Sequence, residues 1–504
     1  MKQLSLLIIL ILNSVISASY SQNFSLTGYA EINAEGHNGT TGGAGGDEIT
    51  VYSGLELQNT LNDKGDNPLI IYINGQLTYN DKVDVKDVSD ISIIGADSDA
   101  ELNGFGMKIW RAENIIVRNI KIHHVIADYE DAIQIDDCHH VWIDHCELYS
   151  DMAHDKDYYD GLLDIKNGSK YVTASWNYIH DHWKTSLIGH TDKASQMAVD
   201  TAFRVTYHHN YFHRTYSRNP SLRYGTLHAF NNYYKDIVYY CMVSRKGAKA
   251  LIENNYFEDS PSPVSTTFGD PPDGFVCLAN NIYAGTSTED ENDISQTDCS
   301  WNVPYQYYPD STESINTLVP LYSGTGILEF GAGGEPTNIF TLSVEITGSG
   351  SVSPNKGSFM AGTEVQLIAR PEEGWIFEGW IGDVTGDNDT INFTIDTTMS
   401  IIAVFKLNTS VLTVSDELSI LKLKQNYPNP FSDHTEIEFM IPENGLVKLS
   451  VYTVDGRKIS EVIDGYYFKG TYKTVLDRKN LKQGLYLYSL SFNNQSIFQK
   501  LIVK

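Results

Sequence analysis

Acidic and basic side chains gather in two different stretches in the middle of this chain. Residues 121–165 contain twelve Asp and Glu against two Lys, whereas residues 201–250 contain eight Lys and Arg against one acid, Asp236. Carboxylates are ligands that a hard cation such as Ca²⁺ prefers, and Lys and Arg bind carboxylates. Brought together by folding, the two stretches would let a metal ion and basic side chains hold carboxylate groups. Uneven surface charge is the competing interpretation.

The charge of the whole chain limits its partners. The formal net charge is −28 with His neutral, which argues against nucleic acids and anionic membranes because their phosphates would be repelled. The five cysteines are an odd number, so at least one is unpaired within the chain, and they do not form a disulfide scaffold. No spacing of Cys or His resembles a zinc finger.

A short β-rich unit recurs between residues 114 and 284 and would position these side chains. Its markers are 26, 32, 33, 22, 23 and 26 residues apart: Asn119, His145, Asn177, Asn210, Asn232, Asn255 and Asn281. A base period in the low twenties with loop insertions predicts a parallel β-helix, whose coils bury their apolar faces by stacking. Stacked Asn side chains can form a hydrogen-bonded ladder. A β-sandwich, the rival fold, requires no Asn at coil spacing.

We therefore predict an all-β chain, with a right-handed parallel β-helix over residues 22–325 and two small β-sandwich-like domains after it. The glycine-rich residues 42–46 and the apolar residues 69–73 are expected to form the opening coil and its cap, because solenoid ends need protection. A linker is predicted at 326–339, and alternating strands with turn signals predict β-domains at 340–406 and 418–504.

The first residues have the layout of a secretory signal peptide. Lys2 precedes an apolar run at 4–12 and then small and polar residues, so residues 1–21 are predicted to be removed on export. The run is too short for a permanent anchor, and no later stretch approaches the roughly 20 apolar residues that span a bilayer. The mature protein is expected to be exported, without a membrane span.

Six short motifs occur in the order typical of one enzyme family. They are residues 131–133, 141–145, 160–166, 183–185, 218–225 and 228–233, which read DAI, VWIDH, DGLLDIK, WKT, RNPSLRYG and HAFNNY. Because of these motifs, the segment of residues 28–285 resembles the pectate lyase family of polysaccharide lyases. The resemblance implies cleavage of α-1,4-polygalacturonate by calcium-assisted β-elimination, which gives 4,5-unsaturated oligogalacturonides.

The resemblance implies that Asp131, Asp160 and Asp164 bind Ca²⁺. In an extended strand Asp160 and Asp164 would lie about 13 Å apart, too far to share one ion, so the chain must bend, which Gly161 makes easy. Solvated loop carboxylates are the alternative interpretation.

The family often has another acidic ligand two positions before the first, where this chain has Tyr129. Asp128 or Glu130 would have to replace it, and the calcium affinity depends on whether one of them does.

The resemblance also assigns the basic residues. It implies that Lys184 binds the substrate carboxylate, that Arg218 abstracts the proton, and that Arg223 is a second carboxylate-binding group in the catalytic set. Both arginines suit carboxylates because a guanidinium binds them with two parallel hydrogen bonds. A free guanidinium has a pKa above about 12, which conflicts with a role of Arg218 as a base at neutral pH; an alkaline optimum and nearby cations would lessen this conflict. Trp183 would stack on a sugar ring or pack within the protein.

Adjacent ionisable pairs are interpreted as structural. Neighbours on a strand point to opposite faces, so Asp144 and His145 are not expected to act as a dyad, and with Trp142 they are expected to pack beside the site. The same reasoning argues against zinc sites at three histidine pairs: His123 and His124, His139 and His140, and His208 and His209.

The two C-terminal segments resemble known modules. Residues 348–354, 377–380 and 403–405 resemble an internalin-type B repeat. Residues 426–431, 455–457 and 500–504 are similar to the C-terminal sorting domain of the type IX secretion system, and an immunoglobulin-like accessory domain is the alternative. The resemblances imply a secreted or surface-attached monomer with two partners, polygalacturonate and the secretion machinery.

Three other functions compete. A pectin lyase on methyl-esterified substrate would not need calcium, and the carboxylate trio argues against it. A polygalacturonase needs paired acids flanking the bond, and the adjacent pair Asp136 and Asp137 lacks that family's motifs. A non-catalytic β-helix that binds carbohydrate at the cell surface would not require Lys184, Arg218 and Arg223 together.

Overall fold

The structure is a computed structural model that describes residues 23–285, 292–408, 421–479, 481–493 and 495–504. The chain divides into two compact units near Phe340, and each is described separately. The predicted signal peptide lies outside the described residues. None of the helices in the described ranges has the length and hydrophobicity that a bilayer crossing requires.

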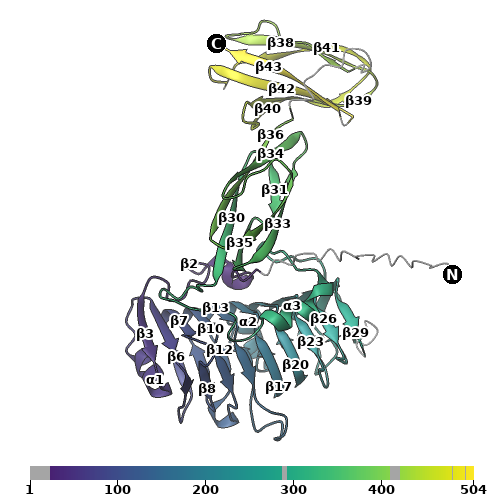
Figure 1. Cartoon of the computed structure of the whole chain (residues 1–504). Helices are drawn as coiled ribbons and strands as arrows, with labels where there is room; N and C mark the ends of the chain where they lie inside the picture. Colours follow the sequence, from purple (N-terminus) through teal and green to yellow (C-terminus); the bar gives the residue numbers. More distant parts are fainter. Residues whose placement is uncertain (1–22, 286–291, 409–420, 480, 494) are drawn as a thin grey trace, which may run out of the picture. The chain divides into compact units, whose positions relative to one another are not determined.

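Three parallel sheets wind into the predicted β-helix (Figure 1). Apart from β3 (Asp47–Val51), which pairs with the next strand β4 (Leu69–Ile73), each strand pairs with the strand three places on in the chain, so one coil contributes one strand to each sheet. The first sheet contains β3, β4, β7 (Ser89–Gly95), β10 (Glu113–Arg118), β13 (His139–Asp144), β16 (Lys170–Ser175), β19 (Arg204–His208), β22 (Thr226–Phe230), β25 (Lys249–Glu253) and β28 (Phe275–Ala279).

The other two sheets complete each coil. The second sheet contains β5 (Gln76–Leu77), β8 (Glu101–Asn103), β11 (Lys121–His123), β14 (Glu147–Tyr149), β17 (Tyr178–Lys184), β20 (Tyr211–Ser217), β23 (Tyr233–Lys235), β26 (Tyr256–Glu258) and β29 (Ile282–Ala284). The third contains β6 (Val83–Lys86), β9 (Met107–Trp110), β12 (Ile133–Asp136), β15 (Leu163–Lys166), β18 (Leu187–Ile188), β21 (Ser221–Arg223), β24 (Met242–Arg245) and β27 (Val264–Ser265).

The core lies inside the coils and follows the alternation of the strands. Ile71, Ile93, Val117 and Ile143 are fully buried and stack from strand to strand in the first sheet. Each coil therefore covers the apolar face of the next, which is why a single coil could not fold alone.

The predicted Asn ladder is present over five coils. The side-chain amide of Asn177 donates to Oδ1 of Asn210 at 2.9 Å, and the same bond repeats onward through Asn232, Asn255 and Asn281 at 2.9 to 3.1 Å. Each of these amides also donates to a backbone carbonyl, for example Asn177 to Ile143 and Asn210 to Ala174. The bonds satisfy the polar groups at the bend and fix the register between coils.

The open end of the β-helix is covered by a helix that the sequence pattern did not reveal. Helix α1 (Gly54–Asn62) begins after Ser53, whose hydroxyl accepts a hydrogen bond from the amide of Glu56 at 3.2 Å. Its residues Leu57 and Leu61 are buried in the β-helix core. The remaining elements of this unit are β1 (Asn33–Ala34), β2 (His37–Asn38), α2 (Ala194–Asp200), α3 (Ile315–Tyr322) and the 3₁₀ turns η1 (Tyr29–Glu31), η2 (Ala127–Tyr129) and η4 (Thr312–Ser314).

The segment predicted as a linker contacts the β-helix. The amide of Gly326 donates to Oδ1 of Asn119 at 2.8 Å, and the hydroxyl of Tyr72 donates to the carbonyl of Gly331 at 2.7 Å. Among the cysteines, Cys277 and Cys299 form a disulfide, while Cys138, Cys146 and Cys241 are buried thiols.

The two C-terminal segments form β-domains, as predicted. One has two sheets built from β30 (Ile339–Thr347), β31 (Gly350–Ser353), β32 (Lys356–Met360), β33 (Thr363–Pro371), β34 (Trp375–Gly382), β35 (Thr390–Ile395) and β36 (Met399–Leu407). The other has two sheets built from β37 (Lys422–Leu423), β38 (His434–Ile441), β39 (Gly445–Thr453), β40 (Lys458–Tyr467), β41 (Gly470–Asp477), β42 (Gly484–Phe492) and β43 (Gln495–Val503).

Candidate active site

Asp131 and Asp164 converge on Gly161 at the edge of the third sheet. Asp131 precedes β12 and Asp164 lies in β15, and both are almost completely buried. The amide of Gly161 donates to Oδ1 of Asp131 at 2.8 Å. A Cβ atom at position 161 would lie 2.7 Å from Oδ1 of Asp131 and 2.5 Å from Oδ1 of Asp164. Glycine is required here because any side chain would collide with both carboxylates.

A lysine without an assigned role completes this pair. Nζ of Lys166 lies 2.7 Å from Asp131 and 3.5 Å from Asp164. Burial, together with the charge of Asp131, raises the pKa of Asp164 to about 7, and burial also raises the pKa of Asp131. Two buried carboxylates against one ammonium leave excess negative charge, which a further cation would offset.

Asp160 stands slightly apart from the other two carboxylates. Its side chain is 43% exposed, and Oδ1 lies 3.0 Å from Nζ of Lys184. The three carboxylates do not all have an oxygen within 4.8 Å of one another. The charge of Asp160 nevertheless acts to raise the pKa of both Asp131 and Asp164, so the three carboxylates lie near one another, while Asp160 pairs with Lys184.

The residues near Tyr129 do not add an acid to this group. The hydroxyl of Tyr129 donates to the carbonyl of Asn80 at 2.9 Å, and Glu130 pairs with Lys82 at 2.8 Å and Lys108 at 3.5 Å. Asp128 is exposed on η2.

Lys184 and Arg218 lie beside the carboxylates at the ends of neighbouring strands. Lys184 ends β17 and forms a parallel bridge with Gly161. Arg218 follows β20 with a left-handed φ of 63°, an uncommon conformation for a residue with a side chain, and its carbonyl accepts the amide of Ser186 at 2.7 Å. Its charge acts to lower the pKa of Asp164.

Arg223 lies in the same region but has a protein partner. Its Nε lies 2.6 Å from Asp192, which also pairs with Arg245 at 2.6 Å. Burial raises the pKa of the Tyr240 phenol, while Arg218 and Arg223 both act to lower it. The charges of the two arginines therefore both lie near Tyr240.

Trp183 and its neighbour Lys184 have different contact partners. Its indole N–H donates to the carbonyl of His154 at 3.1 Å, and its ring lies against that of Tyr216 with centroids 4.8 Å apart. This arrangement packs the indole within the protein and leaves its contact with a sugar a prediction.

The predicted orientation of Asp144 and His145 is wrong, because the two side chains touch. Nδ1 of His145 lies 2.8 Å from Asp144, which also pairs with Arg118 at 2.9 Å and is joined to Trp142 through Ser175. His145 has a left-handed φ of 49°, so the backbone turns out of the strand and both side chains lie on one side. Both are fully buried.

The same error affected the histidine pairs. The ring nitrogens of His123 and His124 lie 2.6 Å apart, those of His139 and His140 3.1 Å apart, and those of His208 and His209 2.9 Å apart. In each pair the second residue has a φ of 54° or 55°. Strand alternation does not apply across such a turn.

His182 is a site residue that the sequence analysis missed. Its Nε2 donates to the carbonyl of Asp160 at 2.7 Å, and its Nδ1 accepts the hydroxyl of Ser150 at 2.6 Å. Burial lowers its pKa to about 4, so the ring is neutral and fixes the backbone of Asp160. Alternation along β17 was the available signal, because residues 182 and 184 share a face, just as residues 164 and 166 do on β15.

The buried histidines make stability depend on pH. Burial lowers the pKa values of His145, His182, His208 and His228 below the 6.5 of an unfolded histidine. At these four histidines the unfolded chain binds more protons than the folded one between about pH 4 and pH 6.5, so their contribution to the free energy of unfolding falls as pH decreases. The raised pKa values of the site carboxylates Asp131 and Asp164 act in the opposite direction, but at two groups against four. His182 alone contributes roughly 3 kcal/mol, at about 1.4 kcal/mol per pKa unit.

We expect urea unfolding to show a progressive loss of stability from pH 7 to pH 5. Replacing the exposed His434 with Ala should leave this slope unchanged. Stability that does not vary over this range would contradict the conclusion that the four buried histidines are neutral in the folded protein.

Three segments of the chain match models of known protein families. A family model described as Pectate lyase matches residues 4–328, more than half of the 504-residue chain. The chain belongs to the pectate lyase family. The enzyme is therefore a polysaccharide lyase, built on the parallel β-helix. A Divergent InlB B-repeat domain model matches residues 340–409, and a Secretion system C-terminal sorting domain model matches residues 425–504, which implies export.

Relatives cover the lyase part of the chain. It is 41% identical over 310 residues to a pectate trisaccharide-lyase of Bacillus licheniformis, covering 60% of this chain and 87% of that protein. It is 42% identical to pectate lyase A of Emericella nidulans over 279 residues, covering 55% of this chain and 81% of that protein. A pectate lyase of Bacillus sp. N165, solved in complex with trigalacturonate, matches with a TM-score of 0.55 and 36% identity over 60% of this chain and 99% of that one.

Proposed function

We propose that this enzyme cleaves polygalacturonate by calcium-assisted β-elimination at the site formed by Asp131, Asp160, Asp164, Lys184 and Arg218, with Arg223 as a further carboxylate-binding group. The observation that carries the proposal is the convergence of two buried carboxylates on Gly161, beside a lysine and an arginine at the ends of adjacent strands. The proposal agrees with two relatives, a pectate lyase solved with trigalacturonate and an Erwinia chrysanthemi pectate lyase C solved with 30 mM Ca²⁺. The latter is 26% identical and has a TM-score of 0.51, covering 62% of this chain and 99% of that one.

The donor set fits Ca²⁺. Asp131, Asp160 and Asp164 offer only oxygen ligands, and their excess charge requires a cation. A bound Ca²⁺ would neutralise the uronate carboxylate and so acidify the adjacent C5–H bond. Asp160 is the exposed member of the set, and a substrate carboxylate that replaced it as the partner of Lys184 would release it toward Asp131 and Asp164.

The basic residues supply the remaining functions. Within the described part of the chain, the guanidinium of Arg218 has no ion pair with a carboxylate, whereas Lys184 pairs with Asp157 and Asp160, and Arg223 pairs with Asp192. Because no carboxylate of the described residues forms an ion pair with its protonated form, we propose that Arg218 loses its proton to solvent and, as the neutral guanidine, takes the C5 proton. The electrons of the C5–H bond form the C4–C5 double bond, the C4–O bond breaks, and the leaving oxygen takes a proton from water. Lys184 and Arg223 bind and orient carboxylates, and Trp183 contributes sugar contact.

The segments of the chain are proposed to have separate roles in export and catalysis. We infer that residues 1–21 are a signal peptide, that 22–325 form the lyase domain with 326–339 after it, and that 340–406 form an accessory module. Residues 418–504 are inferred to bind the type IX secretion machinery. The enzyme is proposed to act as a monomer.

The test is release of an ultraviolet-absorbing unsaturated product from polygalacturonate, with added Ca²⁺ and with a chelator. We expect release with Ca²⁺ and none with the chelator. Chelator-resistant release from methylated pectin would indicate a pectin lyase, and new reducing ends without the absorbing product would indicate a hydrolase. Sugar binding without cleavage would indicate a carbohydrate-binding surface protein.

A further inference from the structure

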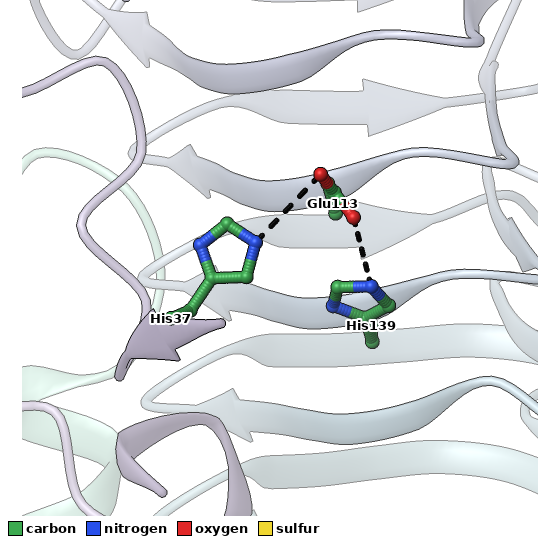
Figure 2. Close-up of side chains that lie close together, drawn as sticks. All are labelled: His37, Glu113 and His139. Carbon is green, nitrogen blue, oxygen red and sulfur yellow. Dashed lines mark ion pairs between the residues drawn. The ribbon is translucent and has the colours of Figure 1, made fainter. Parts of the chain in front are cut away.

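His37, Glu113 and His139 form a compact group on the first sheet, away from the site described above (Figure 2). Nε2 of His37 lies 3.8 Å from Oε1 of Glu113, and Nε2 of His139 lies 2.9 Å from Oε2. One donor atom of each residue lies within 4.8 Å of the other two. In the ranges that the structure describes, no other three His, Cys, Asp or Glu residues meet this condition.

The fold fixes the positions of these three residues. Parallel pairing of β10 with β13 places Glu113 directly beside His139. His37 comes from the short hairpin of β1 and β2, where it pairs with Ala34. The chain entering this hairpin is tied to the same sheet, because the amide of Ala30 donates to the hydroxyl of Thr173 at 3.1 Å.

A hydrogen-bond chain beside His139 sets which of its nitrogens carries a proton. Nε2 of His140 lies 2.9 Å from the carbonyl of Ile32, which can only accept, so this nitrogen donates. The Nδ1 of a neutral His140 then accepts, and it lies 3.1 Å from Nδ1 of His139, which must donate. The Nε2 of a neutral His139 is left with a lone pair directed at Glu113.

A lone pair and a carboxylate oxygen 2.9 Å apart repel unless a cation lies between them. That cation is either a proton on His139 or a metal ion. Lys170, which lies beside His139 on the next strand, pairs with Glu35 at 2.6 Å and so does not supply this cation.

We infer that His37, Glu113 and His139 bind one divalent transition-metal ion of the Zn²⁺ type, which joins the β1–β2 hairpin to the β-helix. Two imidazoles and a carboxylate form a donor set that suits Zn²⁺, with water in the remaining position, and that does not suit Ca²⁺. All three side chains are partly exposed, so water and the ion can reach them. The hydrogen bond from His139 to His140 orients the ligand ring, as outer partners do in metal sites.

This ion would be structural and independent of catalysis. Glu113 and His139 lie on the first sheet, whereas the carboxylates around Gly161 lie at the third. The hairpin has only two residues in each strand, and the ion would add a link to the β-helix beside the ion pair of Glu35 with Lys170. Bound Zn²⁺ should therefore raise the melting temperature without changing lyase activity.

The experiment is a titration of the untagged full-length protein with Zn²⁺ at neutral pH in a buffer containing saturating Ca²⁺, followed by calorimetry and thermal unfolding. We expect one Zn²⁺ per chain. His37→Ala, His139→Ala and Glu113→Gln should each weaken binding at least about tenfold and abolish the thermal shift. His434→Ala, which removes an exposed histidine in the C-terminal domain, should leave both unchanged.

Lyase activity in Ca²⁺ serves as the measure of folding for each variant. If the wild type binds no Zn²⁺, or if His139→Ala binds it as tightly as the wild type, a proton occupies the gap and the inference is overturned. Lyase activity that fell in step with loss of Zn²⁺ would overturn the structural assignment. The Zn²⁺ titration and the thermal shift do not depend on the proposed elimination chemistry, so they test the metal site even if that proposal fails.

Discussion

Arg218→Lys is expected to lower kcat on polygalacturonate by roughly 10²- to 10⁴-fold, the usual contribution of a positioned base, with a much smaller change in KM. Lysine keeps the charge but places a single ammonium where a planar guanidinium lies. The left-handed backbone at this position directs the side chain to one place, so a different head group cannot compensate by moving the chain. Initial rates of unsaturated product formation at saturating Ca²⁺ measure the effect.

Arg214→Lys is the matched control. Arg214 lies on the same strand, β20, is more than half exposed and pairs with Asp181 at 2.7 Å. Its replacement should leave kcat and KM within about twofold, as is usual for exposed ion pairs. If Arg218→Lys retained nearly full kcat, or if both variants lost activity equally, the role proposed for Arg218 would be wrong.

Asp164→Asn is expected to weaken Ca²⁺ binding by at least about tenfold, an effect of about 1.4 kcal/mol or more. Activity at low Ca²⁺ should fall accordingly and recover in part at high Ca²⁺. The substitution removes one charge and keeps an oxygen to accept the amide of Leu187, which now donates to Oδ1 at 2.9 Å. Calcium dependence of the initial rate and direct calcium titration measure the change.

The stability of Asp164→Asn should change in opposite directions with and without the ion. Because burial raises the pKa of Asp164 to about 7, its ionised form destabilises the calcium-free protein above that pH. In a chelator at pH 8, Asp164→Asn should therefore unfold at the same temperature as the wild type or higher, whereas in Ca²⁺ it should unfold lower.

Asp137→Asn, at an exposed position in the turn after β12, is the control and should behave as the wild type in both conditions. A variant at position 164 with an unchanged calcium-induced shift would remove Asp164 from the ligand set.

The fold could be predicted because a β-helix repeats its interactions in sequence order. Each coil meets the next about one period later, so the spacing of Asn177, Asn210 and Asn232 already indicated both the stacking and the ladder that the structure contains. The helix that covers the open end left no such signal, because α1 occurs once and its apolar residues Leu57 and Leu61 mark a short helix of any kind.

The site residues were identified from motifs, but their partners were not. The sequence placed Asp131, Asp164 and Lys184 together only through resemblance to a family. Which cation offsets the buried carboxylates, and which carboxylate faces Lys184, depend on contacts between coils that are about twenty to thirty-five residues apart. The role of Gly161 also depends on tertiary structure, because its lack of a side chain matters only where two carboxylates approach it.

Composition and periodicity thus specified the strands, the coils and the domain order, since these follow from interactions that recur along the chain. The directions of side chains at strand ends came from the folded backbone alone. A left-handed residue at 140 or 145 turns two neighbours to one side, which no alternation rule anticipates. Tertiary structure also decided the surroundings of His139, which strand alternation had excluded as half of a zinc-binding histidine pair. Strand pairing places it beside Glu113, and a hairpin from a distant part of the sequence brings His37 to both.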